Sequence, residues 1–490
     1  MPPATNPYLA LGVRPFINCC STRTVHGGSL MLPEVQAAMA AAAGHFVNLN
    51  ELMAGASARI AALTGAEWGI VTCGSAAAIA TATAAAIAGN DPVKMLRLPQ
   101  TAGMANQVVM LDTQRFPYDQ AIRMVGAEIV EVGSVAELDA MNFSQVAMVA
   151  VLGQRDAGSA VRVEDFARVA HRHGVPVLVD AASEHLSRPN PWLMRGADLV
   201  VYSGGKFLRG PQTSGLLLGR RDLIEVAWAN AAPHRAFCRP MKVGKEDVIG
   251  LLAALEAWFA RDRAGELAHW TRDLETIAAQ VRAVPGCTAR LLPPEPGDEQ
   301  PQLELGWARD RVGIDGMELR RRLLAGTPRI MLDDMSAGAD RLVIEPFSLQ
   351  PGEAEIVGTA LARTLGSAPV VPAAPEPAPA AVAGAWTFDV ALLPKPRQHT
   401  IQLLQDGDVL SGTHSAPDLA GAVSGRVVGD AVTLVIEALY EGAIMTFRFA
   451  GTVAGDAMSG TVLLGSTTPG TRGEVSYTQY GSATWTAQRL

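Results

Sequence analysis

The stretch Val200-Val201-Tyr202-Ser203-Gly204-Gly205-Lys206-Phe207 carries more information than any other part of the chain. It is an apolar run typical of a β-strand, followed by a serine, two glycines and a lysine. A second apolar run, Val175-Pro176-Val177-Leu178-Val179, ends in Asp180 about one strand–helix unit upstream. Further upstream, the turn Thr72-Cys73-Gly74-Ser75-Ala76-Ala77 opens an Ala-rich helix. Ligands of open α/β sheets bind at the carboxyl ends of strands, so we expect these three segments to form one site.

The order of helix-mouth turn, aspartate and lysine is what a pyridoxal 5'-phosphate (PLP) site requires. Lys206 would bind the cofactor aldehyde as a Schiff base, and Asp180 would partner the pyridinium nitrogen. The backbone N–H groups and helix dipole at the turn would hold the phosphate, and Ser203 would add a hydroxyl. The cofactor-binding candidates are therefore Lys206, Asp180, Gly74, Ser75, Ala76 and Ser203. Alone, each has an ordinary alternative, such as a surface lysine, a helix cap or a tight turn; together they favour PLP.

Two glycines directly precede the lysine, and we expect Gly204 and Gly205 to let the backbone approach the cofactor closely.

Several cationic side chains are candidates for binding a substrate anion. Arg329 would clamp a substrate carboxylate through two parallel hydrogen bonds, with a surface arginine as the alternative. Arg239 and Lys242, close to Lys245, would bind an anion or line a subunit interface, or they are the solvated start of a helix. Arg115 is a further polar candidate.

Bulk properties limit the class of protein. The chain has 490 residues, which predicts two or three domains. A net charge of −8 argues against a nucleic-acid partner, because such proteins present a basic face. The five cysteines and nine histidines lack metal-ligand spacing, so we expect no metal and a reduced, cytoplasmic location. No signal peptide is evident, and the apolar stretch 76–88 is too short to cross a membrane.

Four segments are expected. Alternating strands and helices predict a large α/β domain over 1–262 with a mostly parallel sheet, its strands including Val146–Leu152, Val175–Asp180, Leu199–Ser203 and Gly215–Leu218. A small α+β domain is predicted over 263–366. A Pro/Ala-rich extended spacer follows over 367–383.

The last segment, 384–490, repeats Gly-Asp turns between alternating apolar strands, as at Gly407-Asp408, Gly429-Asp430 and Gly455-Asp456. This pattern predicts an antiparallel meander closed into a small barrel, with Trp386 near its start and Trp485 near its end. A ligand-binding role and a structural role for this barrel are equally compatible with the sequence.

Residues 14–365 resemble the selenocysteine-synthase-like branch of fold-type-I PLP enzymes, which have an aminotransferase class-V-like fold. The resemblance rests on Phe16-Ile17-Asn18, Gly27-Gly28-Ser29, Pro33-Glu34-Val35, Leu63-Thr64-Gly65-Ala66-Glu67, Gly74-Ser75-Ala76-Ala77-Ala78, Arg97-Leu98-Pro99, Tyr118-Asp119, Val179-Asp180-Ala181-Ala182-Ser183-Glu184, Ser203-Gly204-Gly205-Lys206, Lys242-Val243-Gly244-Lys245-Glu246 and Leu349-Gln350-Pro351-Gly352-Glu353.

The resemblance implies PLP on Lys206, Asp180 at the ring nitrogen, and a homodimer or larger homo-oligomer. It also adds Ser183 to the cofactor-binding candidates. Two positions depart from the family pattern. Gln114 stands where the family tends to have a histidine that stacks over the ring. Asn18-Cys19-Cys20-Ser21-Thr22 replaces a segment of smaller residues.

The favoured function is a PLP-dependent ammonia-lyase type of reaction on a 2-amino acid. Lys206 would remove the Cα proton, and α,β-elimination would give a 2-oxo acid and ammonia. Racemisation, retro-aldol cleavage, transamination and selenium transfer use the same chemistry and remain alternatives. A non-catalytic scaffold or binding protein built on this fold is an alternative of another class.

Overall fold

The computed structural model describes residues 6–294, 300–368, 377–467 and 480–490. Its large domain is built on a seven-stranded sheet in the order β2-β8-β7-β6-β5-β3-β4. The strands are β2 (Trp68–Thr72), β3 (Gln107–Leu111), β4 (Glu128–Val132), β5 (Val146–Leu152), β6 (Val177–Asp180), β7 (Leu199–Ser203) and β8 (Gly215–Gly219). Only β8 runs antiparallel to its neighbours, β2 and β7, so the predicted mostly parallel sheet is confirmed.

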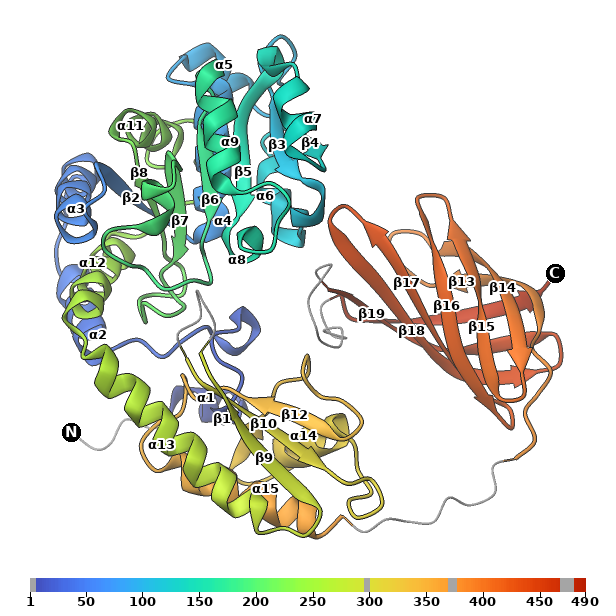
Figure 1. Ribbon diagram of the computed structural model, residues 1–490. Helices are drawn as coiled ribbons and strands as arrows, with labels where there is room; N and C mark the ends of the chain where they lie inside the picture. Colours follow the sequence, from blue (N-terminus) through green and yellow to red (C-terminus); the bar gives the residue numbers. More distant parts are fainter. Residues whose placement is uncertain (1–5, 295–299, 369–376, 468–479) are drawn as a thin grey trace.

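The strands of this sheet are almost wholly apolar because helices cover both faces. Figure 1 shows α9 in front of the sheet and α4 behind it. The helices of the large domain are α2 (Pro33–Ala43), α3 (Leu49–Thr64), α4 (Ser75–Ala88), α5 (Pro92–Arg97), α6 (Gln120–Arg123), α7 (Val135–Ala140), α8 (Gly153–Asp156), α9 (Val163–Ala170), α10 (Pro191–Met194), α11 (Arg221–Asn230) and α12 (Lys245–Ala260). Nearly every residue of α4 is buried, which explains its unbroken run of alanine, threonine and isoleucine.

Long helix α13 (Arg263–Arg282) leads into the small domain. There, a three-stranded antiparallel sheet in the order β12-β10-β9 packs on α13. Its strands are β9 (Cys287–Leu292), β10 (Gln302–Trp307) and β12 (Arg341–Ile344). Helices α14 (Gly316–Ala325) and α15 (Glu353–Gly366) complete it. The N-terminal strand β1 (Phe16–Asn18) pairs in parallel with β11 (Arg329–Met331). The N-terminal segment, expected with the large domain, thus packs with the small one.

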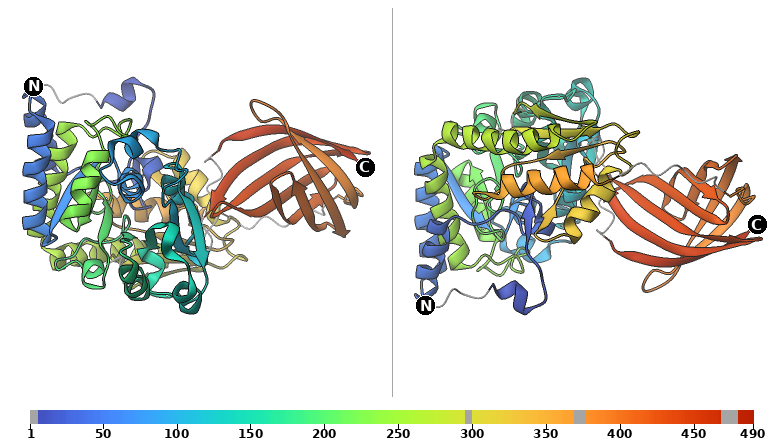
Figure 2. Two further views of the ribbon diagram at one scale, coloured as in Figure 1. Left: turned by 90° about the horizontal axis from the view of Figure 1, so that it is seen from above. Right: turned by 90° about the horizontal axis from the view of Figure 1, so that it is seen from below.

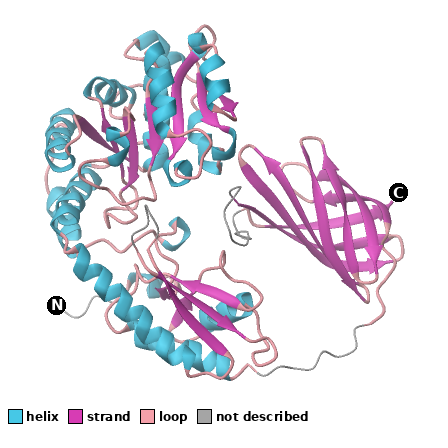
Figure 3. Ribbon diagram, in the orientation of Figure 1, coloured by secondary structure: helices cyan, strands magenta, loops and turns pink. Residues whose placement is uncertain are grey.

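The C-terminal segment forms a closed antiparallel barrel of eight strands, as predicted (Figures 2 and 3). The strands are β13 (Gly384–Val390), β14 (Arg397–Asp406), β15 (Val409–Ala416), β16 (Leu419–Val428), β17 (Ala431–Tyr440), β18 (Ala443–Ala454), β19 (Ala457–Thr467) and β20 (Ser482–Arg489). Pairing of β13 with β20 closes the barrel, and Trp386, Phe388, Phe449 and Trp485 fill its interior.

The Gly-Asp dipeptides occupy hairpin turns, and Gly407, Gly429 and Gly455 all have positive φ. Of the predicted spacer, 369–376 lies outside the described residues. The part that is described, from Pro377, binds the barrel: the Ala380 N–H donates to Gly429 O at 2.7 Å.

Two element boundaries differ from expectation. Strand β6 begins at Val177 rather than Val175, because Pro176 has no N–H to donate to a central strand. Strand β8 extends one residue beyond the predicted Leu218, to Gly219.

Within the described residues, no helix is long and apolar enough to span a bilayer, and no group of three potential ligands could hold a metal ion.

Candidate active site

A cavity of about 380 Å³ lies at the carboxyl ends of β2, β5, β6 and β7. It is the place predicted for ligand binding in this kind of sheet. Its walls are formed by Thr22, Thr24, Gly28, Gly74, Ser75, Ala76, Ile79, Phe116, Tyr118, Leu152, Gln154, Arg155, Asp180, Ala182, Ser183, Ser203, Gly205, Lys206 and Gln212. Seven of the residues predicted to bind the cofactor are among them: Lys206, Asp180, Gly74, Ser75, Ala76, Ser203 and Ser183.

Lys206 follows β7 on a short turn, and its Nζ donates a hydrogen bond to Ser183 Oγ. Burial lowers the pKa of the Lys206 amine, and the nearby Asp180 carboxylate opposes this shift. A lysine with a lowered pKa carries more of the neutral amine, which is the form that attacks an aldehyde and accepts a proton.

Asp180 is the last residue of β6, and its Oδ1 accepts a hydrogen bond from the Ala182 N–H at 2.9 Å. Burial raises the pKa of Asp180, while that hydrogen bond and the charge of Lys206 oppose the rise. A buried carboxylate is stabilised by an adjacent cation, and a protonated pyridine nitrogen is such a cation. Asp180 therefore fits the role of partner to the PLP ring.

Helix α4 presents its first turn to the cavity. Gly74 is the N-cap, with φ 136° and ψ 164°, and no side chain caps the helix. The first backbone N–H groups of α4 are thus not consumed by a side-chain cap, as a phosphate site requires. A Cβ on Gly215 of β8 would lie 2.3 Å from the Gly74 carbonyl carbon, so a glycine on the neighbouring strand fixes this turn in place.

The two glycines before Lys206 serve packing rather than only cofactor approach. A Cβ on Gly204 would lie 2.0 Å from Ser214 Oγ, and one on Gly205 would lie 2.5 Å from Gln212 Cα. Gly205 lines the cavity, whereas Gly204 is not among the cavity-lining residues. The pair mainly allows the lysine turn to stack on the segment that leads into β8.

Gln114 is not among the residues that line the cavity. Its side chain is fully buried, with Nε2 donating to Ser159 Oγ at 3.0 Å and Oε1 accepting from the Leu152 N–H at 2.9 Å. Both ends of the amide are thus used to fasten the end of β5. Aromatic Phe116, two residues later, lines the cavity in its place.

The predicted anion-binding side chains lie elsewhere in the single chain. Arg329 donates to the backbone carbonyls of Leu324 and Arg14 in the small domain. Arg239 and Lys242 line a separate hollow of about 80 Å³ between α3 and α12. Arg115 pairs with Asp119, Glu131 and Glu441. None of the four is among the residues that line the cavity.

Other cavity residues were not predicted. Gln154 and Arg155 come shortly after the buried strand β5. Their position at the carboxyl end of a strand is the signal that could have identified them. Arg155 Nη1 donates to Thr113 O at 2.7 Å, and burial lowers its pKa. Thr22 and Thr24 reach the cavity from the N-terminal segment, where the Gln212 side chain donates to Thr24 O. Because these contacts join residues far apart in the sequence, no local pattern predicts them.

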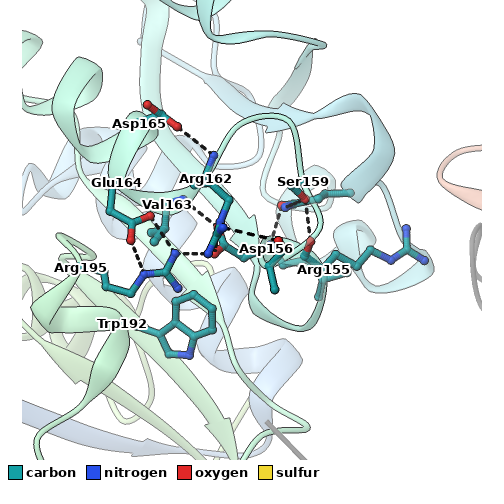
Figure 4. A network of polar contacts seen from close by, with 12 residues as sticks. Arg155, Asp156, Ser159, Arg162, Val163, Glu164, Asp165, Trp192 and Arg195 are labelled. Carbon is teal, nitrogen blue, oxygen red and sulfur yellow. Dashed lines mark hydrogen bonds and ion pairs between the residues drawn. The ribbon is translucent and has the colours of Figure 1, made fainter. Parts of the chain in front are cut away.

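A polar network fixes the loop that carries Gln154 and Arg155 (Figure 4). Buried Asp156 accepts from the Val163 N–H at 2.7 Å and pairs with Arg162 and Arg195. The Arg195 guanidinium lies 4.8 Å from the centre of the Trp192 ring. Such charge-assisted bonds to a fully buried carboxylate hold a short loop in one conformation.

Known proteins resemble this chain in sequence and in fold. A model of the Aminotransferase class-V family matches residues 37–232. A 5'-C-glycyluridine monooxygenase-decarboxylase from a Streptomyces species is 33% identical over 367 residues, covering 72% of this chain and 90% of that protein. A D-glucosaminate-6-phosphate ammonia lyase from Salmonella typhimurium is 32% identical over 363 residues, covering 72% and 96%.

A solved structure of D-glucosaminate-6-phosphate ammonia-lyase superposes with a TM-score of 0.67 at 30% sequence identity, covering 74% of this chain and 99% of that one. An L-seryl-tRNA(Sec) selenium transferase from Moorella thermoacetica is 28% identical over 301 residues, covering 55% and 59%. The resemblance expected from the sequence is confirmed. The chain belongs to the aminotransferase class-V family of PLP-dependent enzymes.

Proposed function

We propose that the protein is a PLP-dependent lyase that converts a 2-amino acid with a β-leaving group, such as a hydroxyl, into a 2-oxo acid and ammonia. The observation that carries this proposal is the convergence of Lys206, Asp180 and the uncapped start of α4 on one cavity. The 32% identity to an ammonia lyase supports the reaction type.

PLP, when bound, supplies an electron sink for the bond pair released at the substrate Cα. The residues that would hold it are Lys206, Asp180, Ser183 and Ser203 with the first turn of α4. Lys206, whose amine is buried and has a lowered pKa, would remove the Cα proton as general base. Asp180 would keep a positive charge on the ring side of the site.

The rest of the cavity fits an anionic substrate. Arg155 brings a cation to the wall, and Gln154, Tyr118 and Thr22 bring polar groups. Guanidinium groups bind carboxylates and phosphates well, so we propose Arg155 as a binder of the substrate's anionic group. The substrate roles predicted for Arg329, Arg239, Lys242 and Arg115 stay predictions, which the arrangement in a single chain does not support.

A second candidate is an oxidative decarboxylation. It is favoured by the 33% identity to a monooxygenase-decarboxylase, which is as high as the identity to the lyase. This reaction would consume O₂ and release CO₂ from the same amino-acid class, whereas the elimination releases ammonia without O₂.

Product analysis separates the two candidates. Purified protein loaded with PLP is incubated with hydroxylated and phosphorylated 2-amino acids under air and under argon. We expect equal release of ammonia and 2-oxo acid in both atmospheres, and loss of all turnover in Lys206→Ala. Turnover that stops under argon and releases CO₂ would establish the oxidative reaction, and full activity in Lys206→Ala would refute both.

The homo-oligomeric state expected from the resemblance stays part of the proposal. Large apolar side chains are exposed over the N-terminal fifty residues, among them Leu11, Val25 and Phe46, and a subunit interface would cover such side chains.

A further inference from the structure

The barrel contacts the large domain through the hairpin turn Tyr440-Glu441-Gly442-Ala443, which joins β17 and β18. Figures 1 and 2 show this end of the barrel beside the large domain. Glu441 Oε2 lies 3.2 Å from Arg115 Nη2 and 3.4 Å from Arg123 Nη1. A Cβ on Gly442 would lie 2.8 Å from Phe116 N and 2.9 Å from Asp119 Oδ2. The turn is therefore in close backbone contact with residues 115–119.

The chemistry of this turn differs from that of the other hairpins. The turns at Gly407, Gly429 and Gly455 carry the repeated Gly-Asp dipeptide. At the contact, Glu441 has φ 47° and Gly442 has φ 74°, so a glutamate occupies a left-handed position that asparagine, aspartate or glycine usually fills. Its carboxylate is the group that meets the two arginines. The Pro417-Asp418 turn between β15 and β16 also lacks the Gly-Asp dipeptide, so what distinguishes the docking turn is this carboxylate.

The surface that receives the turn is a built cluster. Asp119 is fully buried and accepts hydrogen bonds from Arg115 Nε at 2.6 Å and Arg123 Nε at 3.0 Å. Arg115 also donates to Glu131 at 2.5 Å. The arginines are therefore held in place by the large domain, and Glu441 adds a further carboxylate to Arg115 and Arg123.

The receiving segment also forms a wall of the cofactor cavity. Phe116 and Tyr118 line the cavity, and their rings contact each other edge to face with centroids 6.1 Å apart. Gly442 packs on the backbone of Phe116, so the docking contact and the cavity wall share this residue.

We propose that the C-terminal barrel is an arm of the active site, which docks through Glu441 and Gly442 onto Arg115, Asp119 and Arg123 and thereby positions the Phe116–Tyr118 wall. The partner of this surface is the barrel of the same chain. Exposed ion pairs contribute little on their own, so the close packing of Gly442 is the stronger part of the contact. Only the expected change in turnover rests on the proposed function; the docking contact itself does not.

Hydrogen exchange of the full-length protein tests the docking directly, with no need for the cofactor. Gly442→Leu places a side chain into the contact, and its matched control is Gly455→Leu, where φ is also positive and no atom lies within 4 Å of the added Cβ. Glu441→Lys removes the ion pairs without adding bulk, and its control is Glu437→Lys, at an exposed site on the preceding strand β17.

We expect roughly tenfold faster exchange of the amides of residues 113–123 in Gly442→Leu, a smaller effect in Glu441→Lys, and parent-like exchange in both controls. Turnover should fall in the same order. Unchanged exchange in both docking variants, or equal changes in the controls, would overturn the proposal. Faster exchange in a protein that binds no PLP would leave the docking intact and refute the proposed function alone.

Discussion

Glu184 is a half-buried carboxyl group four residues after Asp180. Its Oε2 accepts a hydrogen bond from Trp192 Nε1 at 2.8 Å, and its Oε1 has no hydrogen-bond partner among the described residues. Burial raises the pKa of Glu184 to about 7. The hydrogen bond from Trp192 and the charge of Arg195 lower this pKa, whereas the charges of Asp180 and Asp156 raise it further. Glu184 therefore keeps its proton up to about neutral pH.

This shift makes the free energy of unfolding depend on pH. Because the folded pKa lies above that of an unfolded glutamate, the stabilisation is complete below about pH 4.5 and is lost as pH rises to about 7. Glu184→Gln keeps the acceptor for Trp192 but cannot ionise. We expect the variant to exceed the parent in stability above pH 7 by about 3 kcal/mol, and to match it below about pH 4.5.

Denaturant unfolding of the cofactor-free protein between pH 4.5 and 8 measures this difference. Glu128→Gln, at an exposed site on β4, is the control. Parallel curves for Glu184→Gln and the parent across the whole range would contradict a raised pKa at this residue.

The residues that line the cavity were predictable where local sequence determines position. Asp180 ends an apolar strand, Lys206 follows one, and Gly74–Ala76 form the start of a helix. The expected ends of strands and helices were therefore enough to predict where these residues lie. Gln114 fits the same rule but points away from the cavity, because its amide is needed to bind Ser159 and Leu152. Side-chain direction after a strand end depends on such tertiary contacts, which a single sequence does not reveal.

At the scale of elements, the antiparallel strand β8 supports the turn that we propose to bind the phosphate. Gly215 lies directly against Gly74 and Ser75, with a virtual Cβ 2.3–2.7 Å from their backbone atoms. No side chain fits there without displacing the first turn of α4. The tightness of this contact links the strand order of the sheet to cofactor binding.

Gly215→Ala should therefore weaken PLP binding by roughly tenfold or more while the fold is retained, because the N–H groups of the turn no longer converge. Absorbance titration of the cofactor-free protein measures the affinity. Gly55→Ala, in α3 with open space around its Cβ, should bind PLP like the parent. Equal affinity in Gly215→Ala would show that this turn does not hold the phosphate.

Elements were predicted well where the pattern is periodic. The strands β5 and β7 have the predicted bounds, and the Gly-Asp repeat indicated the barrel. The three-residue strand β1 was not predicted, because it is too short to show periodicity and its partner, β11, is distant in sequence.

At the scale of the whole molecule, the sequence predicted a large domain, a small domain and a barrel, but not how they contact each other. The N-terminal segment pairs with the small domain, and Glu441 contacts Arg115. Both contacts join residues about 310 to 330 positions apart in the sequence. Contacts of this kind leave no local signal. The homo-oligomeric state and the cytoplasmic location stay predictions.

The most direct test of the account is chemical trapping of PLP on the full-length protein. We expect an absorbance band at about 420 nm that borohydride abolishes, with the reduced cofactor recovered on the peptide that contains Lys206. Lys206→Ala should show neither the band nor the labelled peptide. A colourless parent protein that stays colourless with added PLP, or label on another lysine, would contradict the assignment of this cavity as the cofactor site.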